Sequence, residues 1–66
     1  MRILLNGEAR EIISEMSLAD LLTLFELPEK RIAVELNLDV IRRADWATTT
    51  VRANDKVEVI HFVGGG

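Results

Sequence analysis

The 66-residue sequence contains no cysteine, a single histidine and a single proline, and aromatic side chains make up 5% of it. Without cysteine the chain can form no disulfide of its own and offers no thiolate to a metal ion. No apolar run approaches the roughly 20 residues needed to cross a bilayer, and the apolar stretch after Met1 is too short for the core of a signal peptide. These absences favour a cytoplasmic protein with no membrane partner.

The composition predicts one compact domain. Hydrophobic residues make up 48% of the chain and charged residues 29%, with a formal net charge of -3. The negative charge argues against a nucleic-acid partner, because phosphate-binding proteins normally present a basic patch. Two basic pairs, Lys30-Arg31 and Arg42-Arg43, stand apart in the sequence, and we interpret each as solvated surface.

The first half of the chain predicts a β-hairpin and then a helix. Residues 2–5 and 9–13 flank Asn6-Gly7, a pair typical of a two-residue hairpin turn because both residues accept a positive φ. Ser17 is a suitable helix N-cap, and apolar residues at 18, 21, 22 and 25 indicate one buried helix face. Pro28 should end the helix near Leu27, after about three turns.

The second half predicts three further strands and a helical turn. Residues 32–36 alternate apolar and polar side chains, residues 40–41 form a short strand, and residues 44–47 form a turn in which Trp46 covers the core. Residues 56–63 form the last strand, with 57, 59, 61 and 63 on one face and 58, 60 and 62 on the other. The helix should connect the hairpin to a parallel neighbouring strand.

This order of elements predicts an α+β fold. Five strands form a mixed sheet that wraps around one main helix, with the short helical turn beside it. We assign residues 1–63 to this domain and residues 64–66 to a flexible glycine tail.

The tail consists of Gly64, Gly65 and Gly66. Glycine has no side chain to pack and loses the most conformational entropy when ordered, so the tail adds nothing to the core. Extended, it reaches roughly 10 Å, and without Cβ atoms it can enter a narrow channel. The ionised carboxylate of Gly66 can attack the α-phosphate of ATP to give an acyl-adenylate, and a sulfur nucleophile can then displace AMP and leave a thiocarboxylate. A frayed terminus is the simpler interpretation of the same glycines.

The sequence contains no competing catalytic pattern. His61 has no cysteine partner and lies on an alternating strand, which is typical of a structural or interface histidine. No phosphate-binding loop, zinc-ligand spacing or EF-hand pattern is present. We therefore expect a substrate of partner enzymes rather than an enzyme, with no bound cofactor and no metal.

Several segments resemble the thiamine-biosynthesis sulfur carrier family (ThiS), whose members have the ubiquitin-like β-grasp fold. They are residues 3–8 (Ile-Leu-Leu-Asn-Gly-Glu), 17–22 (Ser-Leu-Ala-Asp-Leu-Leu), 32–37 (Ile-Ala-Val-Glu-Leu-Asn), 43–47 (Arg-Ala-Asp-Trp-Ala) and 57–66. The last segment, Val-Glu-Val-Ile-His-Phe-Val-Gly-Gly-Gly, is the most specific. The sequence departs from the family pattern at Leu38-Asp39, Ile41-Arg42 and Asn54, where glycine or Val-Pro is common.

The resemblance implies a role for the tail. An E1-like adenylating enzyme would use ATP to adenylate Gly66, and a desulfurase system would supply the sulfur of the resulting thiocarboxylate. Thiazole synthase would then accept this sulfur for the thiazole ring of thiamine. Gly64 and Gly65 would provide access rather than chemistry.

Two other functions remain open from the sequence. The first is the small subunit of molybdopterin synthase, which has the same fold and a diglycine thiocarboxylate. The second is a ubiquitin-like interaction module or tag that transfers no sulfur.

The docking residues follow by analogy with ubiquitin-like proteins, whose partners grip the sheet and the strand leading to the tail. We expect His61, Phe62 and Val63 to contact the partner enzymes. Phe62 and Val63 point to opposite faces of the strand, so one of the two can instead be a core residue.

Overall fold

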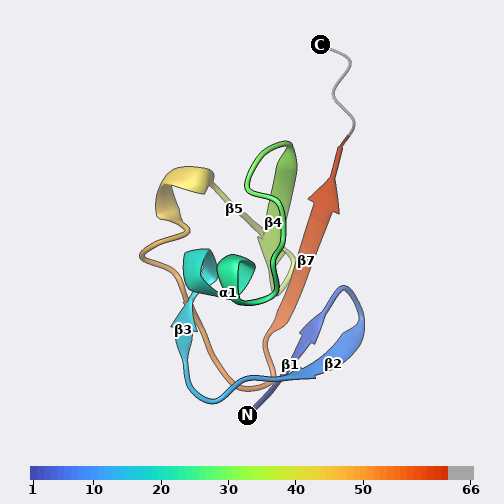
Figure 1. Ribbon diagram of the computed structural model, residues 1–66, viewed down its shortest axis with the longest axis vertical. Helices are drawn as coiled ribbons and strands as arrows, with labels where there is room; N and C mark the ends of the chain where they lie inside the picture. The colour runs from blue at the N-terminus through green and yellow to red at the C-terminus, as the bar shows by residue number, and fades with distance from the viewer. Residues whose placement is uncertain (63–66) are drawn as a thin grey trace.

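The computed structural model describes residues 1–62 of the chain. Its main layer is a five-stranded sheet in the order β2-β1-β7-β4-β5, and a smaller sheet pairs β3 with β6. Figure 1 shows α1 on one side of the main sheet, with β7 running roughly along the long axis of the molecule. The predicted mixed sheet around one main helix is confirmed. Val63 and the predicted tail, residues 64–66, lie outside the described residues.

The N-terminal hairpin forms as predicted. β1 (Arg2–Leu5) and β2 (Glu8–Glu11) pair in antiparallel fashion. The turn between them has φ of 51° at Asn6 and 81° at Gly7, the positive values that a two-residue hairpin turn requires. The second strand is shorter than residues 9–13, because the chain leaves the sheet at Ile12, which is buried in the core.

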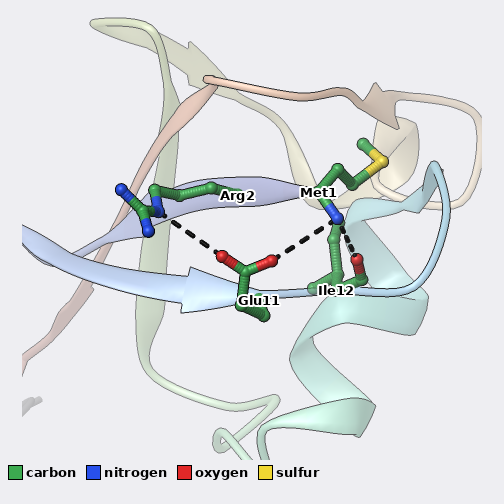
Figure 2. Close-up of polar contacts among 4 residues, drawn as sticks. All are labelled: Met1, Arg2, Glu11 and Ile12. Atoms are coloured by element: carbon green, nitrogen blue, oxygen red, sulfur yellow. Dashed lines mark hydrogen bonds and ion pairs between the residues drawn. The ribbon is translucent and has the colours of Figure 1, made fainter.

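The first residue of the chain is held against the end of β2. The Met1 ammonium donates a hydrogen bond of 2.7 Å to the Ile12 carbonyl and lies 3.5 Å from a carboxylate oxygen of Glu11. Arg2 lies 3.4 Å from the other oxygen of the same carboxylate, as Figure 2 shows. These contacts close the hairpin at the end opposite its turn.

The helix begins where the sequence predicts. Ser17 Oγ accepts a 3.0 Å hydrogen bond from the Asp20 amide and caps α1 (Leu18–Leu24). Ser17 also belongs to β3 (Met16–Ser17), which pairs with β6 (Thr50–Val51). The sequence did not predict this second sheet, because a strand of two residues is too short to produce an alternating pattern.

The helix is shorter than predicted. α1 has 7 residues, about two turns, and ends before Leu27. Glu26 adopts a φ of 55°, its amide bonds the Thr23 carbonyl at 3.1 Å, and the Leu27 amide bonds the Leu22 carbonyl at 2.8 Å. This pair of bonds is a Schellman C-cap. The residue at the position of Glu26 is normally glycine, so the sequence contains no indication that the helix ends here.

The central strand of the main sheet is β7 (Lys56–His61). It pairs in parallel with β1 and in antiparallel fashion with β4 (Ile32–Leu36). The helix therefore does not lead to a parallel neighbour of the hairpin, as we had expected, because β7 inserts between β1 and β4. The Val59 amide also donates to Asn6 Oδ1 at 2.8 Å, which ties β7 to the hairpin turn.

β4 continues into β5 (Asp39–Ile41) and then into a 3-10 helix, η1 (Arg43–Asp45). η1 is the predicted helical turn. Trp46 follows it, is buried and donates from Nε1 to the Ile41 carbonyl at 2.9 Å. Trp46 covers the core, as predicted.

The core lies between the main sheet, α1 and the small sheet. Its fully buried side chains come from every layer: Ile3, Leu18, Leu21, Leu22, Val34, Val51 and Val57. The alternation of β7 is confirmed for its first residues, since Val57 is buried, Val59 is half-buried and Glu58 is exposed.

Leu38 has a left-handed backbone conformation that is unfavourable for leucine. It follows Asn37 in the turn between β4 and β5, with φ of 75°, and its side chain is 80% exposed. A leucine in this region costs about 1 kcal/mol, and this one gains little burial in return. Leu38→Gly should therefore raise the free energy of unfolding by about 1 kcal/mol and the Tm by about 4–8 °C.

The matched control is Leu38→Ala, which shortens the side chain but keeps the strain. Thermal unfolding followed by circular dichroism should give a change of less than about 0.5 kcal/mol for this variant. Equal stabilisation by both variants would mean that removal of the exposed side chain, rather than relief of the backbone, is responsible.

Candidate functional site

The predicted tail follows the central strand of the sheet. β7 pairs with β1 only at Lys56 and Val57, and with β4 as far as His61, so its end is held by β4. The ladder continues one residue past the strand, because the Phe62 amide donates to the Arg31 carbonyl at 2.9 Å. Figure 1 shows the end of β7 at the opposite end of the molecule from Met1. A chain continuing from Phe62 therefore starts from a well-anchored point.

The described docking candidates are both accessible. His61 is exposed and is the cross-strand neighbour of Ile32. Phe62 is 50% exposed, so it is not a core residue. Val63, the third candidate, and the site residues Gly64, Gly65 and Gly66 lie outside the described residues.

Exposed apolar side chains lie on the sheet face turned away from α1, which we call the outer face. Ile60 is 48% exposed and pairs across the strands with Ala33, while Val40 on β5 is 69% exposed. Phe62 follows Ile60 by two residues, in the alternation that places it on the same face. The outer face thus carries apolar surface close to the point where the tail begins.

The outer face also holds two acidic residues of like charge. Glu35 on β4 and Glu58 on β7 are direct cross-strand partners, and Val40 is the other neighbour of Glu35. Like charges directly opposite one another destabilise a sheet. Neither glutamate has an ion-pair partner within the described residues. A partner protein with a cation at this position would relieve the repulsion.

Sequence reasoning missed Ile60, Val40 and the two glutamates as surface candidates. The alternation of the last strand already placed Ile60 with Glu58 and Phe62 on one face. It did not identify that face as the exposed one, and the neighbours on β4 and β5 require the strand register. The alternation of Glu58 with Ile60, close to the tail, could have indicated an exposed apolar residue on this face.

Other kinds of site are not found in the described part of the chain. Residues 1–62 form no pocket, and no group of three or more His, Cys, Asp or Glu side chains among them could hold a metal ion. Within the same residues no helix is long and apolar enough to cross a membrane.

Comparison with known proteins identifies the family. The model of the ThiS family matches residues 3–66, nearly the whole chain. The chain belongs to the ThiS family. The resemblance drawn from the sequence motifs is therefore confirmed at the level of the family.

Individual relatives agree with this assignment. A sulfur carrier protein ThiS from Bacillus subtilis is 34% identical over 50 residues, which are 76% of each chain. The crystal structure of a thiamine biosynthesis protein (ThiS) from Geobacter metallireducens superposes with a TM-score of 0.89 at 30% identity and covers 100% of both chains. This match confirms the β-grasp fold.

A third relative is much longer than this chain. A thiazole synthase from Paramagnetospirillum magneticum is 33% identical over 66 residues, which are 100% of this chain but 20% of that protein. The chain thus spans a fifth of the length of this relative.

Proposed function

We propose that this ThiS-family chain is a sulfur carrier for the thiazole ring of thiamine, and that the carboxylate of Gly66 is its working group. The family match supports the proposal most directly, because it extends through residue 66 and so includes the glycine tail. The pairing of β7 with β4 as far as His61 fits the same role, since it holds the strand from which the tail continues.

The chemistry takes place at the end of the chain in two steps. An oxygen of the Gly66 carboxylate attacks the α-phosphorus of ATP, the bond to the β-phosphate oxygen breaks, and pyrophosphate leaves. The product is an acyl-adenylate with a reactive carbonyl carbon. Hydrosulfide, or a carrier that delivers its equivalent, attacks this carbon, and AMP leaves with the electron pair of the broken bond. The Gly66 carboxylate has then exchanged one oxygen for sulfur.

The carrier domain presents the tail, and the partner enzymes supply the rest. An E1-like adenylating enzyme binds ATP, a desulfurase system delivers sulfur drawn from cysteine, and thiazole synthase accepts it. The thiazole synthase of Paramagnetospirillum magneticum supports the last partnership, because a segment similar to this whole chain lies within that protein. Gly64 and Gly65 let the tail enter the narrow active sites of these enzymes.

We place the docking of the partner enzymes on the outer face and the end of β7. Phe62, Ile60 and Val40 offer accessible apolar area there. The opposed Glu35 and Glu58 offer negative charge to a partner cation. His61 and Val63 flank Phe62 and complete the contact.

The test combines the purified chain with an E1-like adenylating enzyme from the same organism, ATP and sulfide. Intact mass spectrometry should detect the replacement of one oxygen by sulfur at Gly66, and added thiazole synthase should consume this species while forming thiazole. Protein isolated from its host should end at Gly66, in carboxylate and thiocarboxylate forms.

Two results would contradict the proposal. Sulfur transfer to a molybdopterin precursor, with none to thiazole, would assign the chain to molybdopterin synthesis. Isopeptide conjugates to lysines of other proteins, without a thiocarboxylate form, would show that the chain is a ubiquitin-like tag.

A further inference from the structure

Basic residues from two separate parts of the sequence lie near the end of β7. Arg43, in η1, donates from Nη2 to the carbonyl of Glu29. Two residues further along, the Arg31 carbonyl accepts the Phe62 amide at 2.9 Å. Figure 1 shows η1, the loop before β4 and the end of β7 at the same end of the molecule. We call Lys30, Arg31 and Arg43 the basic collar; all three residues are exposed.

The basic collar differs from Arg2, Arg10 and Arg52, which form ion pairs, and resembles Arg42 and Lys56, which form none within residues 1–62. The ion pairs of residues 1–62 involve the Met1 ammonium, Arg2, Arg10 and Arg52. These groups belong to the N-terminal hairpin and to the turn before β7. No collar residue forms an ion pair within residues 1–62. Positive charge is therefore left unneutralised next to the residue from which the tail continues.

The structure also fixes parts of the collar in advance. The Arg43 guanidinium stacks on the Trp46 ring, 4.7 Å from its centroid, and the Glu29 carbonyl holds its outer nitrogen. Arg31 has a φ of 60°, which is unfavourable for arginine, and its carbonyl bond to Phe62 keeps the loop in place. A cation held in position loses less side-chain entropy when it binds an anion.

We infer that the basic collar docks on an acidic rim of the adenylating enzyme, around the opening that admits the tail. This inference rests on the proposed function. Gly66 lies four residues beyond Phe62, so its carboxylate can reach at most about 14 Å from Phe62. The collar therefore stays at the surface of the enzyme while the carboxylate reaches ATP.

An acidic rim is expected on the adenylating enzyme rather than on thiazole synthase. It must bring the anionic end of the tail beside the triphosphate of ATP, and the two like charges repel one another. Attraction between the collar and the rim offsets this repulsion from outside the active site. With the tail extended, this distance exceeds the Debye length of about 8 Å at physiological ionic strength, so an acidic rim need not disturb the binding of ATP.

The experiment compares two double charge reversals by ATP–pyrophosphate exchange with the E1-like adenylating enzyme. Lys30→Glu with Arg31→Glu changes the collar. Arg52→Glu with Lys56→Glu is the matched control, because it alters the net charge equally at exposed residues away from the tail. The KM for the carrier is measured at low salt and at about 0.5 M salt, where the Debye length is about 5 Å or less.

The collar variant should raise the KM for the carrier about tenfold or more at low salt, with kcat nearly unchanged, since charges at the rim of an interface mainly affect association. The difference should shrink at high salt, and the control should change KM less than about threefold. Lys30→Gln with Arg31→Gln should give an intermediate KM.

Equal KM values for the collar and control variants would overturn the inference and leave the proposed function intact, because the wild-type chain would still support exchange. A rise in KM that persists at high salt would also overturn it, since the effect would then not be electrostatic. Absence of exchange with the wild-type chain would overturn the proposed function, and the inference with it.

Discussion

Deletion of Gly66 should abolish ATP–pyrophosphate exchange with the adenylating enzyme while the fold survives. The deletion leaves a terminal carboxylate on Gly65, but moves it back by about 3.5 Å along an extended chain. A misplacement of 1 Å at a reacting centre can cost about 100-fold in rate, so we expect a loss of at least that factor. Addition of one alanine after Gly66 should have the same effect, because the carboxylate then overshoots ATP.

The fold of the deletion variant should be unchanged, since β7 ends at His61 and its last ladder bond involves Phe62. Circular dichroism and the Tm should match those of the parent chain. Gly65→Ala is the matched control, as it keeps the length of the tail and its carboxylate but adds a Cβ atom. It should weaken exchange less than the deletion does. Exchange at the parental rate after the deletion would refute the proposed role of Gly66.

Much of the fold could be predicted because its signals are local. Asn6-Gly7 specifies the hairpin turn through positive φ at both residues, and Ser17 caps the helix as its hydroxyl predicts. β4 and β7 follow from alternating apolar positions. The end of the helix could not be predicted in this way. Its left-handed C-cap position usually holds glycine, whereas this chain has Glu26 there.

The pairing of strands lay beyond the sequence for a different reason. The parallel pair of β1 and β7 depends on which strand enters the centre of the sheet, and no local pattern encodes that choice. The opposition of Glu35 and Glu58 follows only from this arrangement. Both basic pairs are exposed, as predicted, but the bond from Arg43 to the Glu29 carbonyl, which brings the two segments together, could not be read from the sequence.

The proposed role of Gly66 comes from chemistry and from the family resemblance rather than from the fold. A terminal carboxylate needs no neighbouring residue to make it a substrate for ATP, so the sequence alone could indicate it. The surface that we propose for docking depends on strand register. The strand alternation placed Ile60 and Phe62 together, but only the register adds Val40 and Glu35 to them.

Trp46→Ala should cause the largest loss of stability among the single substitutions considered. Trp46 is 6% exposed, packs in the core and donates from Nε1 to the Ile41 carbonyl. Truncation of a buried tryptophan to alanine costs about 3–5 kcal/mol. One small core supplies a net stability of about 3–5 kcal/mol in a domain of this size, so the variant should be largely unfolded at 25 °C. Urea titration followed by far-UV circular dichroism measures this directly.

Ile13→Ala is the matched control, because it removes a large apolar side chain that is 97% exposed. It should change the free energy of unfolding by less than about 0.5 kcal/mol.

Trp46→Phe separates the two roles of the indole, because it keeps an aromatic ring in the core but loses the bond to Ile41 and part of the surface on which Arg43 stacks. If it folds, its KM for the adenylating enzyme should rise with little change in kcat. A loss of less than about 1 kcal/mol in Trp46→Ala would mean that Trp46 covers the core without stabilising it.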